Sequence, residues 1–140
     1  MQTHHDLNAL TDDEFLRAFR TGEIANHAFH HRDHLRLAYL QIARLGLASA
    51  SDEVTSGIRR FAEHHGRGDR YNDTMTRFWL RVVDLAMRRH PGLAFDGLLE
   101  AEPHLLDKAL PFKHWSPESL MAVEARAAWR EPDLGPIPAS

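Results

Sequence analysis

The chain has 140 residues, 43% of them hydrophobic and 26% charged, which is typical of a globular domain with a single hydrophobic core. Its net charge of −3 with neutral histidines, and the interleaving of its arginines with acidic residues, argue against a nucleic-acid partner. The absence of cysteine excludes disulfides, thiolate metal sites and cysteine nucleophiles.

The N-terminal residues 1–10 are polar and are predicted to be flexible. They lack the apolar core of a secretion signal, and no apolar run reaches the ~20 residues that span a bilayer, so we expect a cytoplasmic protein without a membrane partner. Thr11 and Glu14 form a capping box that begins the first helix, and Gly22 ends it. Asn26 then either caps an early start of the second helix or lies in a loop before it.

The second helix is the most apolar of the sequence and is expected to end or loosen at Gly46. Residues three and four apart share a helix face, so His31 and His34 lie on one stripe. The same stripe contains apolar residues expected in the core, namely Leu35, Ala38, Ile42 and Leu45. Asp33 and Arg36 lie off this stripe and are spaced for an exposed ion pair. The two imidazoles are therefore predicted to point inward.

A third helix is predicted to begin at Ser51, which has the side chain of a helix cap, and to end at Gly66. Its apolar residues recur on one face, which consists of Val54, Ile58, Phe61 and Ala62. His65 continues that face and is predicted to point inward, whereas His64 points away from it.

The fourth helix is capped by Asn72 or Asp73 and is expected to stop before the Pro91-Gly92 pair. Asp73 is then either the cap itself or a carboxylate in the first turn. Residues 93–110 are predicted to hold one or two short helices, broken at Pro103.

A last helix is predicted after Ser116, because a cap residue is followed there by proline at the first helical position. Its apolar side contains Leu120, Met121, Val123, Ala127 and Trp129. Residues 131–140 carry three prolines and are predicted to form an extended tail that packs on the surface through Leu134 and Ile137.

No alternating pattern of a β-strand occurs, and every strong periodicity is helical. The sequence therefore predicts an all-α fold: a single compact bundle of five to six helices over residues 11–130, followed by the proline-rich tail.

Eleven histidines are the unusual feature of the composition, and three of them are on predicted inward faces. Two or three imidazoles with a carboxylate suit zinc or a non-haem Fe(II) centre, so His31, His34, His65 and Asp73 are candidate metal ligands. Asp73 is also the candidate catalytic residue, as an anionic ligand or a general base. In the alternative interpretation these side chains are core or helix-end residues bonded to carbonyl groups, which the residues alone favour, because buried polar groups usually find such partners.

Three segments resemble a family of small helical bacterial proteins that has no assigned activity. Residues 29–35 match its aromatic-x-His-x-x-His-Leu motif, and residues 125–136 match Ala-Arg-x-x-aromatic-x-Glu-Pro-Asp-Leu-x-Pro. Residues 71–76 match Tyr-His-Glu-Thr-x-Thr, with Asn72 in place of histidine and Asp73 in place of glutamate. The resemblance covers most of residues 23–138.

The resemblance implies that His31, His34, Asp73 and Thr76 are the positions of functional interest. If the family site is a metal site, the departure at Asn72 implies a lost or weakened ligand in this chain.

The functional prediction is a small-molecule enzyme or binding protein that uses the inward histidines and Asp73, with a divalent metal as candidate cofactor. The rival is a non-catalytic structural or interaction module. The motifs of phosphate loops, serine hydrolases and His-Glu-x-x-His metalloproteases are absent from the sequence. Four aromatic residues could close a small-molecule pocket, although such residues more often lie in a core: Phe78, Trp79, Trp115 and Trp129.

Overall fold

Six α-helices and five 3-10 helices make up the computed structural model, which describes residues 3–137 and has no β-strand within them. The α-helices are α1 (Asp12–Thr21), α2 (His31–His64), α3 (Asp73–Arg89), α4 (Phe95–Ala101), α5 (Pro117–Leu120) and α6 (Val123–Ala127). The 3-10 helices are η1 (Leu7–Ala9), η2 (Asn26–Ala28), η3 (Gly68–Arg70), η4 (Pro103–Leu106) and η5 (Leu110–Lys113). The predicted all-α bundle is confirmed. None of the described helices is long and apolar enough to cross a membrane.

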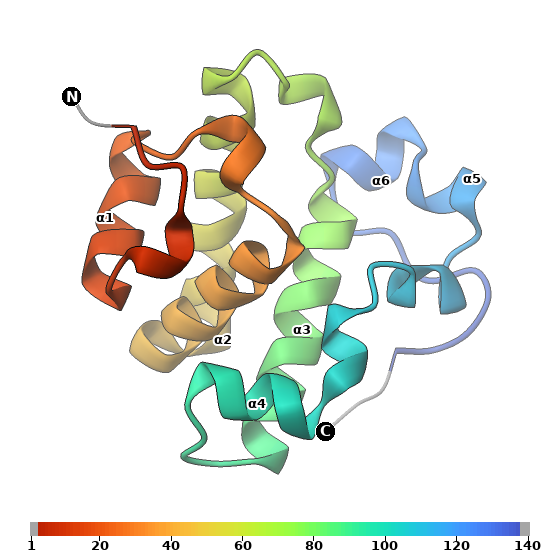
Figure 1. The fold of residues 1–140 in the computed structure, drawn as a ribbon. Helices are drawn as coiled ribbons and strands as arrows, with labels where there is room; N and C mark the ends of the chain where they lie inside the picture. Colours follow the sequence, from red (N-terminus) through yellow and green to blue (C-terminus); the bar gives the residue numbers. More distant parts are fainter. Residues whose placement is uncertain (1–2, 138–140) are drawn as a thin grey trace.

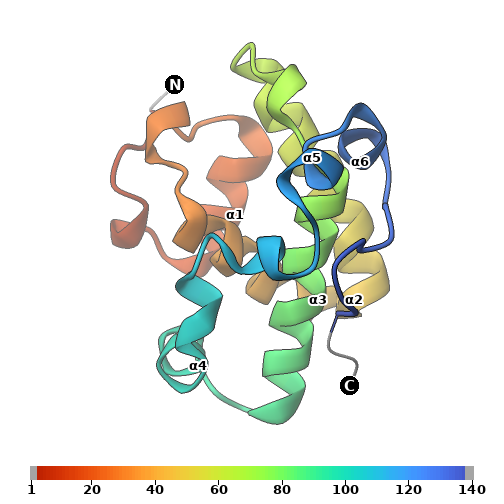
Figure 2. The same ribbon diagram turned by 90° about the vertical axis from the view of Figure 1, so that its right-hand side faces the viewer.

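The helices α2 and α3 pack along each other and form the centre of the domain. Helix α1 packs against α2 and α6 packs against α3, so these two helices lie on opposite sides of the central pair (Figure 1). Helix α4 lies beside the C-terminal part of α3 (Figure 2). Every layer contributes fully buried side chains to the core, among them Phe15, Leu35, Leu37, Phe78, Leu98 and Trp115.

Helix α2 contains both the second and the third predicted helices, joined by a kink at Gly46. This residue has φ 79° and ψ 164°, a conformation that glycine adopts without a steric penalty. The predicted break is thus confirmed, but the predicted cap at Ser51 is wrong. Helical structure resumes directly after the kink, and the Ser51 hydroxyl donates a hydrogen bond to the Leu47 carbonyl at 2.7 Å.

The N-terminal residues 3–10 are held against the domain, in contrast to the flexibility predicted for residues 1–10, of which 1 and 2 lie outside the described residues. Leu7 is buried. The buried Arg36 guanidinium donates to the carbonyls of Leu7 and Leu10 at 3.0 and 2.9 Å. It also pairs with the Asp12 carboxylate at 2.9 Å, which ties η1, α1 and α2 together.

The predicted surface pair between Asp33 and Arg36 is therefore wrong. The Asp33 carboxylate is buried and accepts a hydrogen bond from the His30 backbone N–H at 2.9 Å, at the start of α2. A carboxylate in the first turn of a helix satisfies a backbone donor that otherwise has no partner. Leu45, placed on the inward stripe by its spacing, is also exposed, because it immediately precedes the kink.

The C-terminal region departs from the predicted single helix. Ser116 does cap a helix, since its hydroxyl accepts from the Ser119 N–H at 3.2 Å, but that helix is the single turn α5. A break separates it from α6, and at the break Met121 and Val123 are 49% and 68% exposed. The apolar side predicted there is wrong for these two residues and for Ala127, which is also exposed.

Residues 131–137 of the tail run along the surface as predicted, and the remaining residues 138–140 lie outside the described part. The Asp133 carboxylate accepts from the Ser116 N–H and hydroxyl at 2.9 and 2.7 Å. Ile137 packs against the core, whereas Leu134 is 59% exposed and donates its backbone N–H to the His114 carbonyl. The tail is thus held mainly by polar contacts, with one of its two apolar residues packed.

Candidate functional site

A cavity of about 410 Å³ lies between α2, η3 and the N-terminal half of α3. Its volume falls in the range of ~300–1,000 Å³ common for small-molecule sites. Much of its wall is apolar and includes Phe29, Val54, Ile58, Phe61, Trp79 and Leu80. The polar part of the wall includes His31 and His34, so the predicted inward stripe of α2 faces this cavity.

His31 is fixed by the segment that follows α4. Its Nε2 lies 2.8 Å from the Leu105 carbonyl oxygen, and its ring packs edge-on against Trp79 at a centroid distance of 4.4 Å. Because a carbonyl can only accept, Nε2 carries the proton and Nδ1 is left as an acceptor in the neutral ring. Burial lowers the pKa of His31, and the nearby Lys108 lowers it further against the opposing effect of the Leu105 bond. The ring is therefore neutral at neutral pH.

His34 lies one turn further along α2, with its ring 4.3 Å from that of Phe29. Neither ring nitrogen has a hydrogen-bond partner within residues 3–137. Burial, with a smaller contribution from the charge of His31, lowers the pKa of His34 from 6.5 to about 4. This imidazole is thus a neutral polar group on the cavity wall whose donor and acceptor are both unused.

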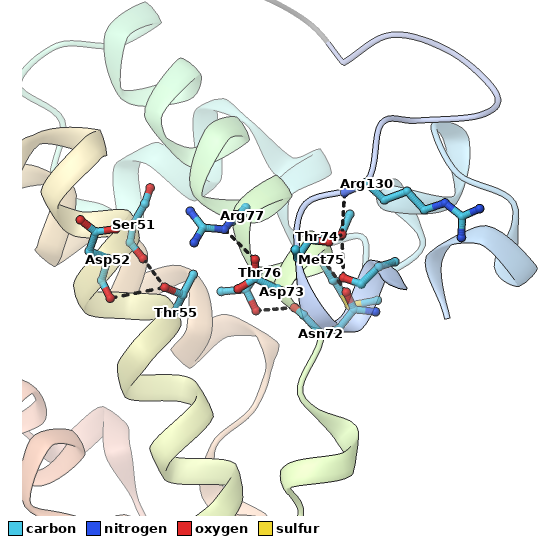
Figure 3. A network of polar contacts seen from close by, with 12 residues as sticks. Ser51, Asp52, Thr55, Asn72, Asp73, Thr74, Met75, Thr76, Arg77 and Arg130 are labelled. Atoms are coloured by element: carbon cyan, nitrogen blue, oxygen red, sulfur yellow. Dashed lines mark hydrogen bonds and ion pairs between the residues drawn. The ribbon is translucent and has the colours of Figure 1, made fainter. Parts of the chain in front are cut away.

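Asn72 caps α3 and links it to the C-terminal region. Its side-chain oxygen accepts from the Met75 N–H at 3.0 Å, and its amide nitrogen donates to the Leu120 carbonyl at 2.8 Å. The Thr76 hydroxyl, also on the cavity wall, donates to the Asn72 carbonyl at 2.8 Å (Figure 3). The asparagine that departs from the family pattern therefore has structural contacts of its own here.

Asp73 is buried but does not line the cavity. The Tyr71 hydroxyl donates to one of its carboxylate oxygens at 2.6 Å. Arg77 Nε donates to the other at 2.8 Å (Figure 3). The Arg59 guanidinium lies 4.0 Å from the same carboxylate. Burial, followed by the bond to Asp73, raises the pKa of Tyr71, so the phenol stays protonated and donates. Asp73 is thus occupied by an ion-pair network and does not face the histidines.

His65 forms the C-terminal cap position of α2 and is also absent from the cavity wall. Its ring lies edge-on to Phe61 at 4.6 Å, and its Nε2 is buried without a partner. His64 is exposed, as predicted.

The predicted set of four metal ligands is therefore not assembled: the cavity brings His31 and His34 together, and Asp73 and His65 lie elsewhere. Over the described residues, no three histidine, aspartate or glutamate side chains gather in a way that could hold a metal ion. The reason lies in the partners of Asp73. Both of its carboxylate oxygens are engaged, one by the Tyr71 hydroxyl and the other by Arg77, away from the histidines.

Of the four aromatic residues predicted to close a pocket, Trp79 lines the cavity. Phe78 and Trp115 are core residues with no exposed surface. Trp129 packs edge-on against Trp115 at 5.4 Å, on the far side of α3 from the histidines.

Three cationic residues on the cavity wall were missed by the sequence analysis: Arg67, Arg70 and Lys108. In the sequence the first two belong to an ordinary polar turn, and Lys108 follows a short helix more than 35 residues later in the chain. The excess of positive charge in the turn before Tyr71 was the one available signal in the sequence.

Comparisons of this chain with protein-family models, with curated proteins and with solved structures find no match. The resemblance to the bacterial family therefore stays a prediction, and the function must be argued from the cavity itself.

Proposed function

We propose that the cavity binds a small organic molecule and that His31 and His34 orient it. The observation that carries this proposal is the state of His34, an imidazole on the wall of a cavity of ligand size with no protein partner for either ring nitrogen. A ligand in the cavity would supply the hydrogen-bond partner that the protein does not provide for this half-buried ring.

The two imidazoles offer defined hydrogen-bonding groups. Each neutral ring has one donor and one acceptor. The donor of His31 is used by Leu105, so His31 offers an acceptor, whereas His34 offers both. A ligand with a hydroxyl or amide group would match this pair.

Binding fits these histidines better than catalysis. A general base works best when its pKa is near the working pH, and the pKa of His34 is about 4. A divalent metal does not enter the proposal, because the cavity wall carries two imidazoles and three cationic side chains but no carboxylate. The rival, a structural or interaction module, predicts no saturable binding of small molecules.

The test uses N-phenyl-1-naphthylamine, a neutral probe whose fluorescence rises in apolar sites. We expect one probe molecule per chain, and we expect Ala62→Trp, which fills the cavity from its wall, to weaken binding by at least about tenfold. Ala43→Trp is the matched control, because Ala43 is exposed on the same helix and does not line the cavity. Circular dichroism checks that both variants fold. Absence of saturable binding, or equal binding by all three proteins, would overturn the proposal.

A further inference from the structure

We infer that the ligand is an organic anion: an apolar body held between the helices, with a carboxylate, sulfonate or phosphate group held by Arg67, Arg70 and Lys108. This inference rests on the proposed function and adds the chemical class of the ligand.

The charge of the cavity wall is the first observation. Three cationic side chains line the cavity, and no aspartate or glutamate does so among the described residues. The chain as a whole has a net charge of −3, so this concentration of positive charge is local and opposite in sign to the rest of the protein. A cavity with one sign of charge and low-dielectric walls attracts ligands of the opposite sign.

The second observation is that these cations have no acidic partner. Some of the other arginines do pair with carboxylates, as Arg36 does with Asp12 and Arg77 with Asp73. In the part of the chain that the structure describes, no ion pair involves Arg67, Arg70 or Lys108. Their donors therefore remain available to an incoming anion.

The third observation is the backbone that carries the two arginines. Arg67 N–H donates to the Ala62 carbonyl at the end of α2, and Arg70 N–H donates to the Arg67 carbonyl at 2.9 Å. These bonds hold both residues at the two ends of η3, on the same edge of the cavity. Guanidinium groups suit the binding of an anion, because their planar donors match the oxygen atoms of a carboxylate or phosphate.

The interior of the cavity also suits an organic anion with an apolar body. The apolar walls, which include Ile58, Phe61 and Trp79, suit the body of the ligand. The two histidines on the same cavity wall are uncharged, so they can bind polar atoms of the body without requiring a second anion. The cavity wall thus combines cationic groups with a large apolar surface.

The test compares two probes that share one skeleton. N-phenyl-1-naphthylamine is neutral, and 8-anilino-1-naphthalenesulfonate adds a sulfonate to the same rings. We expect the sulfonate probe to bind the parent protein at least about tenfold more tightly at low salt, and salt to weaken only this probe. In Arg67→Gln/Arg70→Gln its affinity should fall by at least about tenfold, while that of the neutral probe stays within about twofold.

The control is Arg44→Gln/Arg60→Gln, which removes the same charge from exposed arginines that do not line the cavity. It should leave both affinities within about twofold of the parent. If the neutral probe binds and the sulfonate probe is no tighter, or if both double variants lose the same affinity for it, the anion inference is overturned while the proposed function stands. If neither probe binds, both fail.

Discussion

Two polar regions meet at the start of α3, and they differ in whether their polar atoms have hydrogen-bond partners within the protein. In the junction, which we define as Asn72 and Thr74 with their partners in the C-terminal region, the polar atoms are paired. The Thr74 hydroxyl, with no exposed surface, lies 2.7 and 2.9 Å from the carbonyls of Ala125 and Ala128. It also accepts from the Arg130 N–H at 3.1 Å (Figure 3).

In the cavity, on the neighbouring face of α3, the imidazole of His34 has no protein partner at all. Both regions contain polar side chains on otherwise apolar surfaces, so residue type does not distinguish them. What distinguishes them is whether neighbouring backbone groups complete the hydrogen bonds. Completed networks hold the fold together, and the incomplete one is available to a ligand.

The largest effect is expected from the junction. Thr74→Val keeps the shape of the side chain but leaves two carbonyls and the Arg130 N–H without their partner. We expect a loss of about 2–4 kcal/mol in the free energy of unfolding, measured by urea denaturation. Thr21→Val is the control, since Thr21 is exposed and its hydroxyl bonds only to carbonyls of its own helix. A loss below about 0.5 kcal/mol for Thr74→Val would show that the junction does not depend on this hydroxyl.

The next effect is a loss of stability at low pH that arises from His34 on the cavity wall. His34 has a pKa of about 4 in the folded chain and 6.5 as its ordinary value, so the unfolded chain takes up a proton first as the pH falls. Stability from this residue is fully present above pH 6.5 and is lost as the pH falls towards about 4. We expect the free energy of unfolding to fall by about 1–3 kcal/mol over this window, and by less where water in the cavity screens the charge. The measurement is the unfolding free energy of His34→Leu minus that of the parent, which should grow as the pH falls, because only the parent carries this titrating group; a constant difference contradicts the assignment.

Asn72→Ala tests whether Asn72 stabilises the fold through its own hydrogen bonds. It removes the acceptor for Met75 N–H and the donor to the Leu120 carbonyl. We expect a loss of about 1–2 kcal/mol. Asn72→Asp should recover part of it in thermal unfolding, because it restores the acceptor but not the donor. Full stability in the alanine variant would contradict a structural role.

The smallest effect on stability is expected when the unpaired imidazole of the cavity is removed. His34→Leu at neutral pH removes a polar ring that has no protein partner, so we expect the free energy of unfolding to change by less than about 0.5 kcal/mol or to rise. The same variant should alter the affinity for N-phenyl-1-naphthylamine. A loss comparable with that of Thr74→Val would mean that His34 has a structural partner after all.

The sequence by itself determined the local features of this protein. The capping box of Thr11 and Glu14, the break at Gly46 and the cap at Ser116 all depend on residues within four positions of one another. The helical periodicity also predicted that His31 and His34 face inward, because spacing along one helix fixes which residues share a face.

The tertiary structure decided which of these residues meet. Asp73 was grouped with the histidines because it begins the next helix, but its carboxylate bonds to Tyr71 and Arg77 instead. Arg36 likewise finds its partners in η1 and α1 rather than at Asp33. The cavity wall brings together Arg67, Arg70 and Lys108, although Lys108 is distant from the two arginines in the chain. Helix rotation and long-range contacts arise from the packing of the whole core, so no local spacing rule contains them.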